Sequence, residues 1–130
     1  MNRKIVITAA VLGLISIVLG AFGAHALKKV LTVEQLVSFE TGVRYQMYHA
    51  LFLLFVGTTQ FLTEKAKKYV YYTALTGVIL FSGSIFLLAT QEISQINFRF
   101  LGPVTPIGGV FLISSWLLLA VHVCKQKTHN

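Results

Sequence analysis

The sequence predicts an all-α fold, a four-helix transmembrane bundle with an interfacial extension before the second span. The first observation is composition. Of the 130 residues, 55% are hydrophobic and 12% are charged, which is about half the charged fraction of a soluble domain. The second observation is that the basic residues lie in short groups at the ends of apolar runs, as expected of lysines and arginines that flank membrane spans. These groups are Arg3-Lys4, Lys28-Lys29, Lys65-Lys67-Lys68 and Lys125-Lys127.

Composition and length also exclude several classes of protein. Disordered chains are poor in apolar residues, so this composition excludes a disordered protein. The length fits a single integral membrane domain over residues 1–130. Cys124 is the only cysteine, so neither an intrachain disulfide nor a finger-type zinc site is expected, and we predict no metal site. The net charge of +7 does not gather into one basic face. We therefore expect no nucleic-acid partner.

The first predicted span covers residues 5–27, which contain no Asp, Glu, Lys or Arg. As a helix it would be roughly 34 Å long, enough to cross a hydrocarbon core of about 30 Å. A signal peptide is the alternative, because residues 1–4 are basic and residues 24–26 fit a small-x-small cleavage pattern. The apolar run exceeds the roughly 7–15 residues of a signal-peptide core. We therefore favour a retained helix.

The second predicted span covers residues 45–62 and belongs to a longer helix. Thr32 and Gln35 have the spacing of a capping box, in which each side chain satisfies a free backbone donor at the start of a helix. Gly42 and Gly57 are tolerable in a helix, so we expect the helix to continue to Leu62. Residues 33–44 then form the interfacial extension.

The third predicted span covers residues 69–90, and the fourth covers residues 106–124. Thr105 followed by Pro106 predicts the start of the fourth helix, with threonine as N-cap and proline at the first helical position. The connection over residues 91–104 contains glycine and proline and is expected to be a loop with an interfacial turn.

Counting basic residues predicts the orientation. With four spans, one side of the membrane holds seven basic residues: Arg3, Lys4, Lys65, Lys67, Lys68, Lys125 and Lys127. The other side holds four: Lys28, Lys29, Arg44 and Arg99. The positive-inside rule therefore predicts that both termini are cytoplasmic.

A cluster of polar groups in the non-cytoplasmic half of the predicted bundle is the candidate site. Ionisable residues inside membranes are costly and are by default functional candidates. Glu40 and Arg44 are spaced i, i+4 and are expected to pair, and Tyr45 and His49 share the same spacing. His25 ends the first span, and we expect it to lie at a depth similar to that of His49 if the first two spans are antiparallel neighbours.

Three interpretations of this cluster remain open. The five residues His25, Glu40, Arg44, Tyr45 and His49 could form an interfacial hydrogen-bond network that fixes the loop. His25, Glu40, Arg44 and His49 could instead line a polar cavity for a proton, an anion or a lipid headgroup, because histidine titrates near neutral pH. The third interpretation is a cofactor site, in which His25 and His49 ligate a haem axially.

Four segments of the chain resemble the domain-of-unknown-function 423 family. They are residues 20–27 (GAFGAHAL), 41–51 (TGVRYQMYHAL), 82–86 (SGSIF) and 102–109 (GPVTPIGG). Together they extend from the first span to the last. The resemblance implies a small multi-pass protein of bacterial inner membranes and implies no activity. It places His25, Arg44 and His49 inside family motifs.

The sequence contains no catalytic constellation, so we predict a non-enzymatic protein of the cell inner membrane that binds a lipid or a partner protein through its bundle. A small transporter or ion conduit that uses the polar cluster is the first alternative. A bis-histidine haem protein for electron transfer is the second. Membrane lipids are the expected partners, together with a second copy of the chain or a membrane partner protein.

Overall fold

The computed structural model describes residues 1–126, and all regular structure within them is helical. The long helices are α1 (Arg3–His25), α2 (Val33–Thr58), α3 (Glu64–Val78) and α6 (Val104–Gln126). The shorter elements are the 3₁₀ turn η1 (Leu27–Lys29), the π segment η2 (Ile79–Gly83), α4 (Ser84–Ala89), α5 (Gln91–Ser94) and the 3₁₀ turn η3 (Arg99–Leu101).

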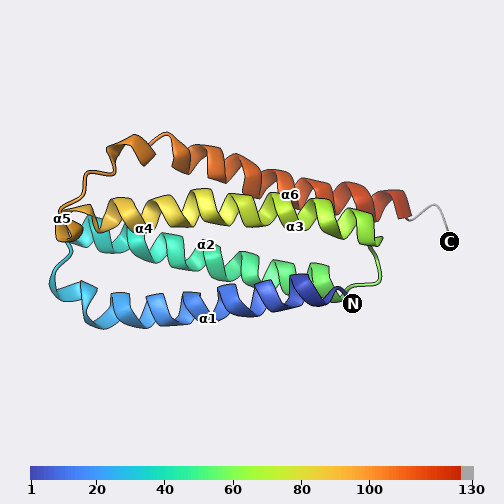
Figure 1. The fold of residues 1–130 in the computed structure, drawn as a ribbon, viewed down its shortest axis with the longest axis horizontal. Helices are drawn as coiled ribbons and strands as arrows, with labels where there is room; N and C mark the ends of the chain where they lie inside the picture. Colours follow the sequence, from blue (N-terminus) through green and yellow to red (C-terminus); the bar gives the residue numbers. More distant parts are fainter. Residues whose placement is uncertain (127–130) are drawn as a thin grey trace.

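These elements form four rods that lie side by side, because α3, η2 and α4 follow one another as a single rod (Figure 1). Successive rods run in opposite directions. The start of α1, the connection between α2 and α3, and the end of α6 therefore lie at one end of the molecule. The η1 turn and the short elements α5 and η3 lie at the other end.

The capping box at the start of α2 is confirmed. The Thr32 hydroxyl accepts from the Gln35 backbone N–H at 3.1 Å, and the Gln35 side chain accepts from the Thr32 N–H at 2.9 Å. The predicted extension over residues 33–44 is thus part of one continuous helix. The expectation that this helix reaches Leu62 is wrong, because Thr59 is extended and the chain turns there to bring Leu62 into the core.

The third and fourth helices begin earlier than their apolar runs. Thr63 caps α3, since its hydroxyl accepts from the Ala66 N–H at 3.1 Å. The prediction of Thr105 as the N-cap of the last helix is wrong. α6 starts at Val104, and the Thr105 hydroxyl bonds to the Ser84 hydroxyl of α4 instead. Pro106 remains compatible with the first turn, where a backbone N–H has no helical partner.

Small residues bring α1 and α2 into close antiparallel contact. At one end the Asn2 N–H donates to the Gly57 carbonyl at 2.7 Å. At the other end a Cβ on Gly23 would lie 3.1 Å from the Phe39 ring. In lipid, where apolar burial drives helix association weakly, such close approach increases dispersion between the helices.

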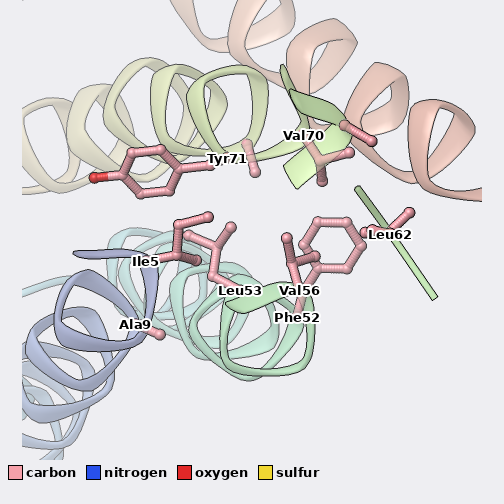
Figure 2. Close-up of a cluster of buried hydrophobic side chains, with 10 residues drawn as sticks. Ile5, Ala9, Phe52, Leu53, Val56, Leu62, Val70 and Tyr71 are labelled. Atoms are coloured by element: carbon pink, nitrogen blue, oxygen red, sulfur yellow. The ribbon is translucent and has the colours of Figure 1, made fainter. Parts of the chain in front are cut away.

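The principal core lies where α1, α2 and α3 meet, near the start of α1. Figure 2 shows side chains of α2 pointing toward Val70 and Tyr71 of α3, with Ile5 of α1 beside them. The buried members of this core are Ile5, Ala9, Phe52, Leu53, Val56, Leu62, Ala66, Val70, Tyr71 and Ala74. Leu118 and Leu119 of α6 pack against this cluster, so it joins all four rods.

Three segments of residues 1–126 are long and apolar enough to cross a membrane: Arg3–Lys29, Glu64–Ala89 and Arg99–Gln126. They correspond in order to the first, third and fourth predicted spans. The predicted second span lies in α2, a 26-residue helix that buries the polar side chains of Gln46 and His49 against its neighbours. A four-span bundle stays a prediction.

Candidate functional site

The polar side chains buried on α2 face the other helices and find partners there. Gln46 is 5% exposed, and its side-chain amide donates to the Leu12 carbonyl of α1 at 3.0 Å. This carbonyl also accepts from the Ser16 hydroxyl at 2.8 Å. Because a buried amide without a partner is costly, this bond favours one register of α2 against α1.

His49, one turn further along α2, is 4% exposed and uses both ring nitrogens. Its Nδ1 lies 2.7 Å from the Tyr45 carbonyl oxygen, and its Nε2 lies 3.0 Å from the indole Nε1 of Trp116 on α6. A carbonyl oxygen can only accept and an indole N–H can only donate. The partners therefore select the neutral imidazole that carries its proton on Nδ1.

This histidine and tryptophan lie in a groove of about 370 Å³ between α2, η2 and α6. Its lining residues are Thr41, Tyr45, His49, Phe81, Gly109, Leu112, Ile113 and Trp116. His49 is buried, whereas Trp116 is 49% exposed and Ile113 is 70% exposed. The groove is therefore open on the outer side of the bundle, and its lining is largely aromatic and aliphatic.

The π segment holds one wall of this groove against α2. The Ser82 hydroxyl donates to the Gly42 carbonyl of α2 at 2.7 Å, and the Phe81 ring lies 5.2 Å from the Tyr45 ring. A π turn inserts an extra residue into a helix and is often found at functional sites. Here it brings Phe81 to the groove while Ser82 contacts α2.

Close backbone approach fixes the opposite wall. A Cβ on Gly108 would meet the backbone of Leu80 and Phe81, and a Cβ on Gly77 would lie 2.7 Å from the Leu112 side chain. Only residues without a Cβ fit at these two positions without a shift of the chain. The predicted loop over residues 91–104 therefore leads into a helix start that packs tightly on the third rod.

The structure separates the residues of the predicted polar cluster. Tyr45 and His49 line the groove together, whereas His25, Glu40 and Arg44 are exposed and are not among its lining residues. Arg44 forms no ion pair with Glu40. Its Nη2 donates instead to the Thr41 hydroxyl at 3.2 Å. The conduit alternative, which places His25, Glu40, Arg44 and His49 on one cavity, gains no support from this arrangement.

The expectation of similar depth for His25 and His49 is wrong. Although α1 and α2 are antiparallel neighbours, the α1 residue opposite this part of α2 is Gly13, whose Cβ would lie 3.8 Å from the Ala50 Cβ. His25 lies three turns further along α1, about 18 Å at 1.5 Å per residue. The difference in depth between His25 and His49 arises because α2 starts at Val33, only a short turn after His25.

The separation of His25 and His49 does not fit the third interpretation, in which both histidines ligate one haem. One iron cannot take axial imidazoles that lie about 18 Å apart along the bundle within one chain. Both nitrogens of His49 are also already bonded to Tyr45 and Trp116. Among residues 1–126 no group of three or more His, Cys, Asp or Glu could hold a metal ion.

Sequence reasoning missed three residues that the structure makes central. Trp116 lies in the fourth predicted span and Gln46 interrupts the apolar run of the second, and neither was assigned a contact. Lys67 was counted among the charges of the cytoplasmic side. Lys67 is in fact 2% exposed, and its ammonium lies 3.5 Å from the Gly57 carbonyl at the end of α2. A positive charge is favourable at the C-terminal end of a helix. No local pattern signals such contacts between rods.

Apolar helices with polar groups buried between them define this chain as a membrane protein with several apolar helices. It belongs to the family described as "Protein of unknown function (DUF423)", whose model matches residues 19–109. All four segments that carried the resemblance lie in this range, and the resemblance is confirmed.

Curated relatives are similar over nearly their whole length. UPF0382 membrane protein YwdK of Bacillus subtilis is 38% identical over 128 residues, covering 95% of this chain and 98% of the relative. UPF0382 membrane protein SH2409 of Staphylococcus haemolyticus is 37% identical over 123 residues, covering 95% and 97%. UPF0382 inner membrane protein YgdD of Escherichia coli is 33% identical over 129 residues, covering 97% and 93%. No solved structure matches the chain.

Proposed function

We propose that this chain is a non-enzymatic, four-crossing protein of the cell inner membrane that holds a lipid acyl chain in the groove of His49 and Trp116. The observation that carries the proposal is the groove itself. It is open on the outer side of the bundle, and its polar floor is already satisfied by the bond between His49 and Trp116. An apolar chain can occupy it without leaving a buried donor unpaired.

The fourth crossing is supported by the packing of α2. This helix runs antiparallel to α1, from the contact of Phe39 with Gly23 to the contact of Gly57 with Asn2. If α1 crosses the bilayer, α2 spans the same range of depth and returns the chain to its starting side. The two polar side chains buried on α2 do not oppose this, because Gln46 and His49 are bonded inside the bundle.

The orientation with both termini in the cytoplasm rests on the basic residues. Arg3, Lys4, Lys65 and Lys68 gather with Lys67 and Lys125 at the end where α1 starts and α6 ends. Lys127, which was included in the sequence count, lies outside the described residues. The other side holds Lys28, Lys29 and Arg99 at that end, with Arg44 further along α2, so the excess of positive charge still favours a cytoplasmic position for the first end.

The proposal of a non-enzymatic role is supported by how the hydroxyl and imidazole groups are used. The Ser82 hydroxyl donates to a backbone carbonyl, and the Ser84 hydroxyl bonds to Thr105 and to the Phe81 carbonyl. His49 is held between a carbonyl and an indole. None of these contacts joins a nucleophile to a base, which is the arrangement that covalent catalysis requires.

Fluorescence quenching tests the groove directly, because Trp116 is the only tryptophan in the chain and lies about midway along α6. In vesicles made of phospholipids brominated midway along the acyl chain, we expect strong quenching of Trp116. Substitution Gly109→Leu should fill much of the groove and weaken the quenching about twofold or more. A Cβ at position 109 has ordinary space, 3.8 Å from the Phe81 ring, so the variant can fold.

The matched control is Gly83→Leu, because a Cβ on this helical glycine meets nothing within 4 Å. We expect its quenching to equal that of the unmodified chain. Equal quenching of the Gly109→Leu variant and the control would show that no lipid chain enters the groove. Quenching by bromine near the headgroup alone would contradict the proposed position of α6 in the bilayer.

A further inference from the structure

A second groove lies at the other side of the bundle, where the starts of α1 and α3 meet. It has a volume of about 380 Å³. Its lining residues are Asn2, Lys4, Ile5, Glu64, Lys68, Tyr71 and Tyr72. Neither the family description nor the lipid-chain groove proposed above concerns this place, so the inference that follows does not depend on them; it rests on the orientation proposed above, with this end in the cytoplasm.

The charges in this groove leave two lysines uncompensated. The Glu64 carboxylate accepts from the Asn2 side-chain amide at 3.1 Å and lies 3.6 Å from the Lys67 ammonium. Lys67 therefore balances Glu64. Within residues 1–126, neither Lys4 nor Lys68 forms an ion pair. The groove thus presents two positive charges that no carboxylate neutralises.

Lys4 is held in place by the tyrosines of α3. Its ammonium donates to the Tyr72 hydroxyl at 2.8 Å and lies 5.1 Å and 5.7 Å from the ring centroids of Tyr72 and Tyr71. A lysine ordered in this way loses less side-chain entropy when it binds a ligand. The Tyr72 oxygen accepts from Lys4, so its own proton remains available for an anionic oxygen.

The groove lies where two apolar segments, Arg3–Lys29 and Glu64–Ala89, both begin. The start of each segment is at the level of the lipid headgroups if the segment spans the hydrocarbon core. Both helices also present their positive dipole ends there. Basic pockets between transmembrane helices on the cytoplasmic side are suited to lipid phosphates.

We propose that the groove of Lys4, Lys68 and Tyr72 binds the phosphate of an anionic phospholipid headgroup. The two ammonium groups neutralise the phosphate charge, and the Tyr72 hydroxyl donates a directed hydrogen bond to a phosphate oxygen. The hydrocarbon chains of the same lipid then lie along the apolar surfaces of α1 and α3. A zwitterionic lipid has the same phosphate but no net charge, so it binds more weakly.

Native mass spectrometry of the full chain in a mild detergent tests this proposal. The probes are phosphatidylglycerol and phosphatidylcholine with identical acyl chains, each added at increasing concentration. The double substitution Lys4→Gln and Lys68→Gln should weaken phosphatidylglycerol binding roughly 10- to 30-fold, since each lysine near an anionic surface contributes a roughly fivefold gain in affinity. Phosphatidylcholine binding, which is weaker and involves no net charge, should change much less.

The control removes the same charge at the other end of the bundle, through Lys28→Gln and Lys29→Gln in η1, and should leave phosphatidylglycerol binding intact. Within the same end, Lys65→Gln is the single-charge control for Lys68→Gln, because Lys65 is exposed outside the groove. Equal losses in groove and control variants would overturn the proposal in favour of diffuse charge attraction.

A second pair of variants keeps the charge and tests the geometry. Tyr72→Phe should weaken phosphatidylglycerol binding severalfold, whereas Tyr69→Phe, at a tyrosine that is 51% exposed outside the groove, should have no effect. Added inorganic phosphate distinguishes the source of the anion. The proposal is overturned if inorganic phosphate binds with the same lysine dependence and displaces the lipid at equal concentration.

Discussion

His49 shows how one buried polar residue acquires a defined role from its partners. Its neutral imidazole accepts from Trp116 and donates to the Tyr45 carbonyl, so helices α2 and α6 are joined by a hydrogen bond inside the apolar part of the bundle. The Phe52 ring lies 4.3 Å from the Trp116 ring and restrains the indole. Among residues 1–126, no buried side-chain nitrogen or oxygen lacks a partner.

At the residue scale, we expect Trp116→Phe to destabilise the fold by about 1 kcal/mol. The substitution keeps an aromatic ring but leaves the Nε2 acceptor of His49 without a donor, and hydrogen bonds between membrane helices are worth roughly 0.6–2 kcal/mol. Reversible unfolding in mixed micelles measures the free energy. In a His49→Leu background the same substitution should cost much less, because the coupling has already been removed. Equal costs in both backgrounds would contradict the bond.

At the scale of elements, α2 and the third rod owe their positions to contacts that a single extra methyl group would disturb. The Ser82 hydroxyl of η2 donates to the Gly42 carbonyl, and a Cβ on Gly42 would lie 2.7 Å from the Phe86 ring. α6 crosses the same segment at Gly108. The π segment is thus held between two helices at positions without side chains.

Two alanine substitutions, one at Gly108 of α6 and one at Gly83 of η2, should therefore have effects of opposite sign. In Gly108→Ala, the new Cβ would lie 2.7 Å from the Leu80 carbonyl carbon, which belongs to the backbone and cannot rotate away. We expect a loss of about 1–3 kcal/mol in the free energy of unfolding. In Gly83→Ala, the Cβ meets nothing, and a helical alanine should add about 0.5–1 kcal/mol.

Unfolding in mixed micelles, with helicity followed by circular dichroism, measures both glycine variants. A stable Gly108→Ala variant would mean that α6 does not contact η2 through the backbone. Because the two substitutions are chemically identical, differences in helix propensity alone cannot produce opposite signs.

At the scale of the whole molecule, the four antiparallel rods give the chain two chemically different ends. One end carries the groove of Lys4, Lys68 and Tyr72, and the other carries η1, α5 and η3. The core cluster of Ile5 and Leu53 lies toward the first end and joins all four rods. The groove of His49 and Trp116 lies between these ends, on the outer side of the bundle.

The proposed orientation can be measured with a membrane-impermeant thiol reagent. In a Cys124→Ser background, a cysteine introduced by Ser94→Cys in α5 should react in spheroplasts, where the outer face of the membrane is accessible. A cysteine introduced by Lys65→Cys in α3 should react in inside-out vesicles alone. Both positions are exposed. Labelling of both positions from one side would mean that α3 and α4 do not carry the chain across the bilayer.

Much of the helical framework could be predicted from local patterns in the sequence. The capping box of Thr32 and Gln35 and the long apolar run of α1 are signals carried by neighbouring residues, and the structure contains both features. The end of α2 was predicted less well. It is decided by the turn that buries Leu62 against other rods, and no pattern within residues 58–62 records that contact.

By itself, the sequence determined that the protein is helical, apolar enough for a membrane and a member of its family, because composition and short-range spacing carry those properties. The tertiary structure alone decided which polar residues meet. It pairs His49 with Trp116, 67 positions away in the chain, and it places His25 three turns from His49. The physical reason is that the register between packed helices depends on close contacts at Gly42, Gly57 and Gly108, which are made with residues distant in sequence.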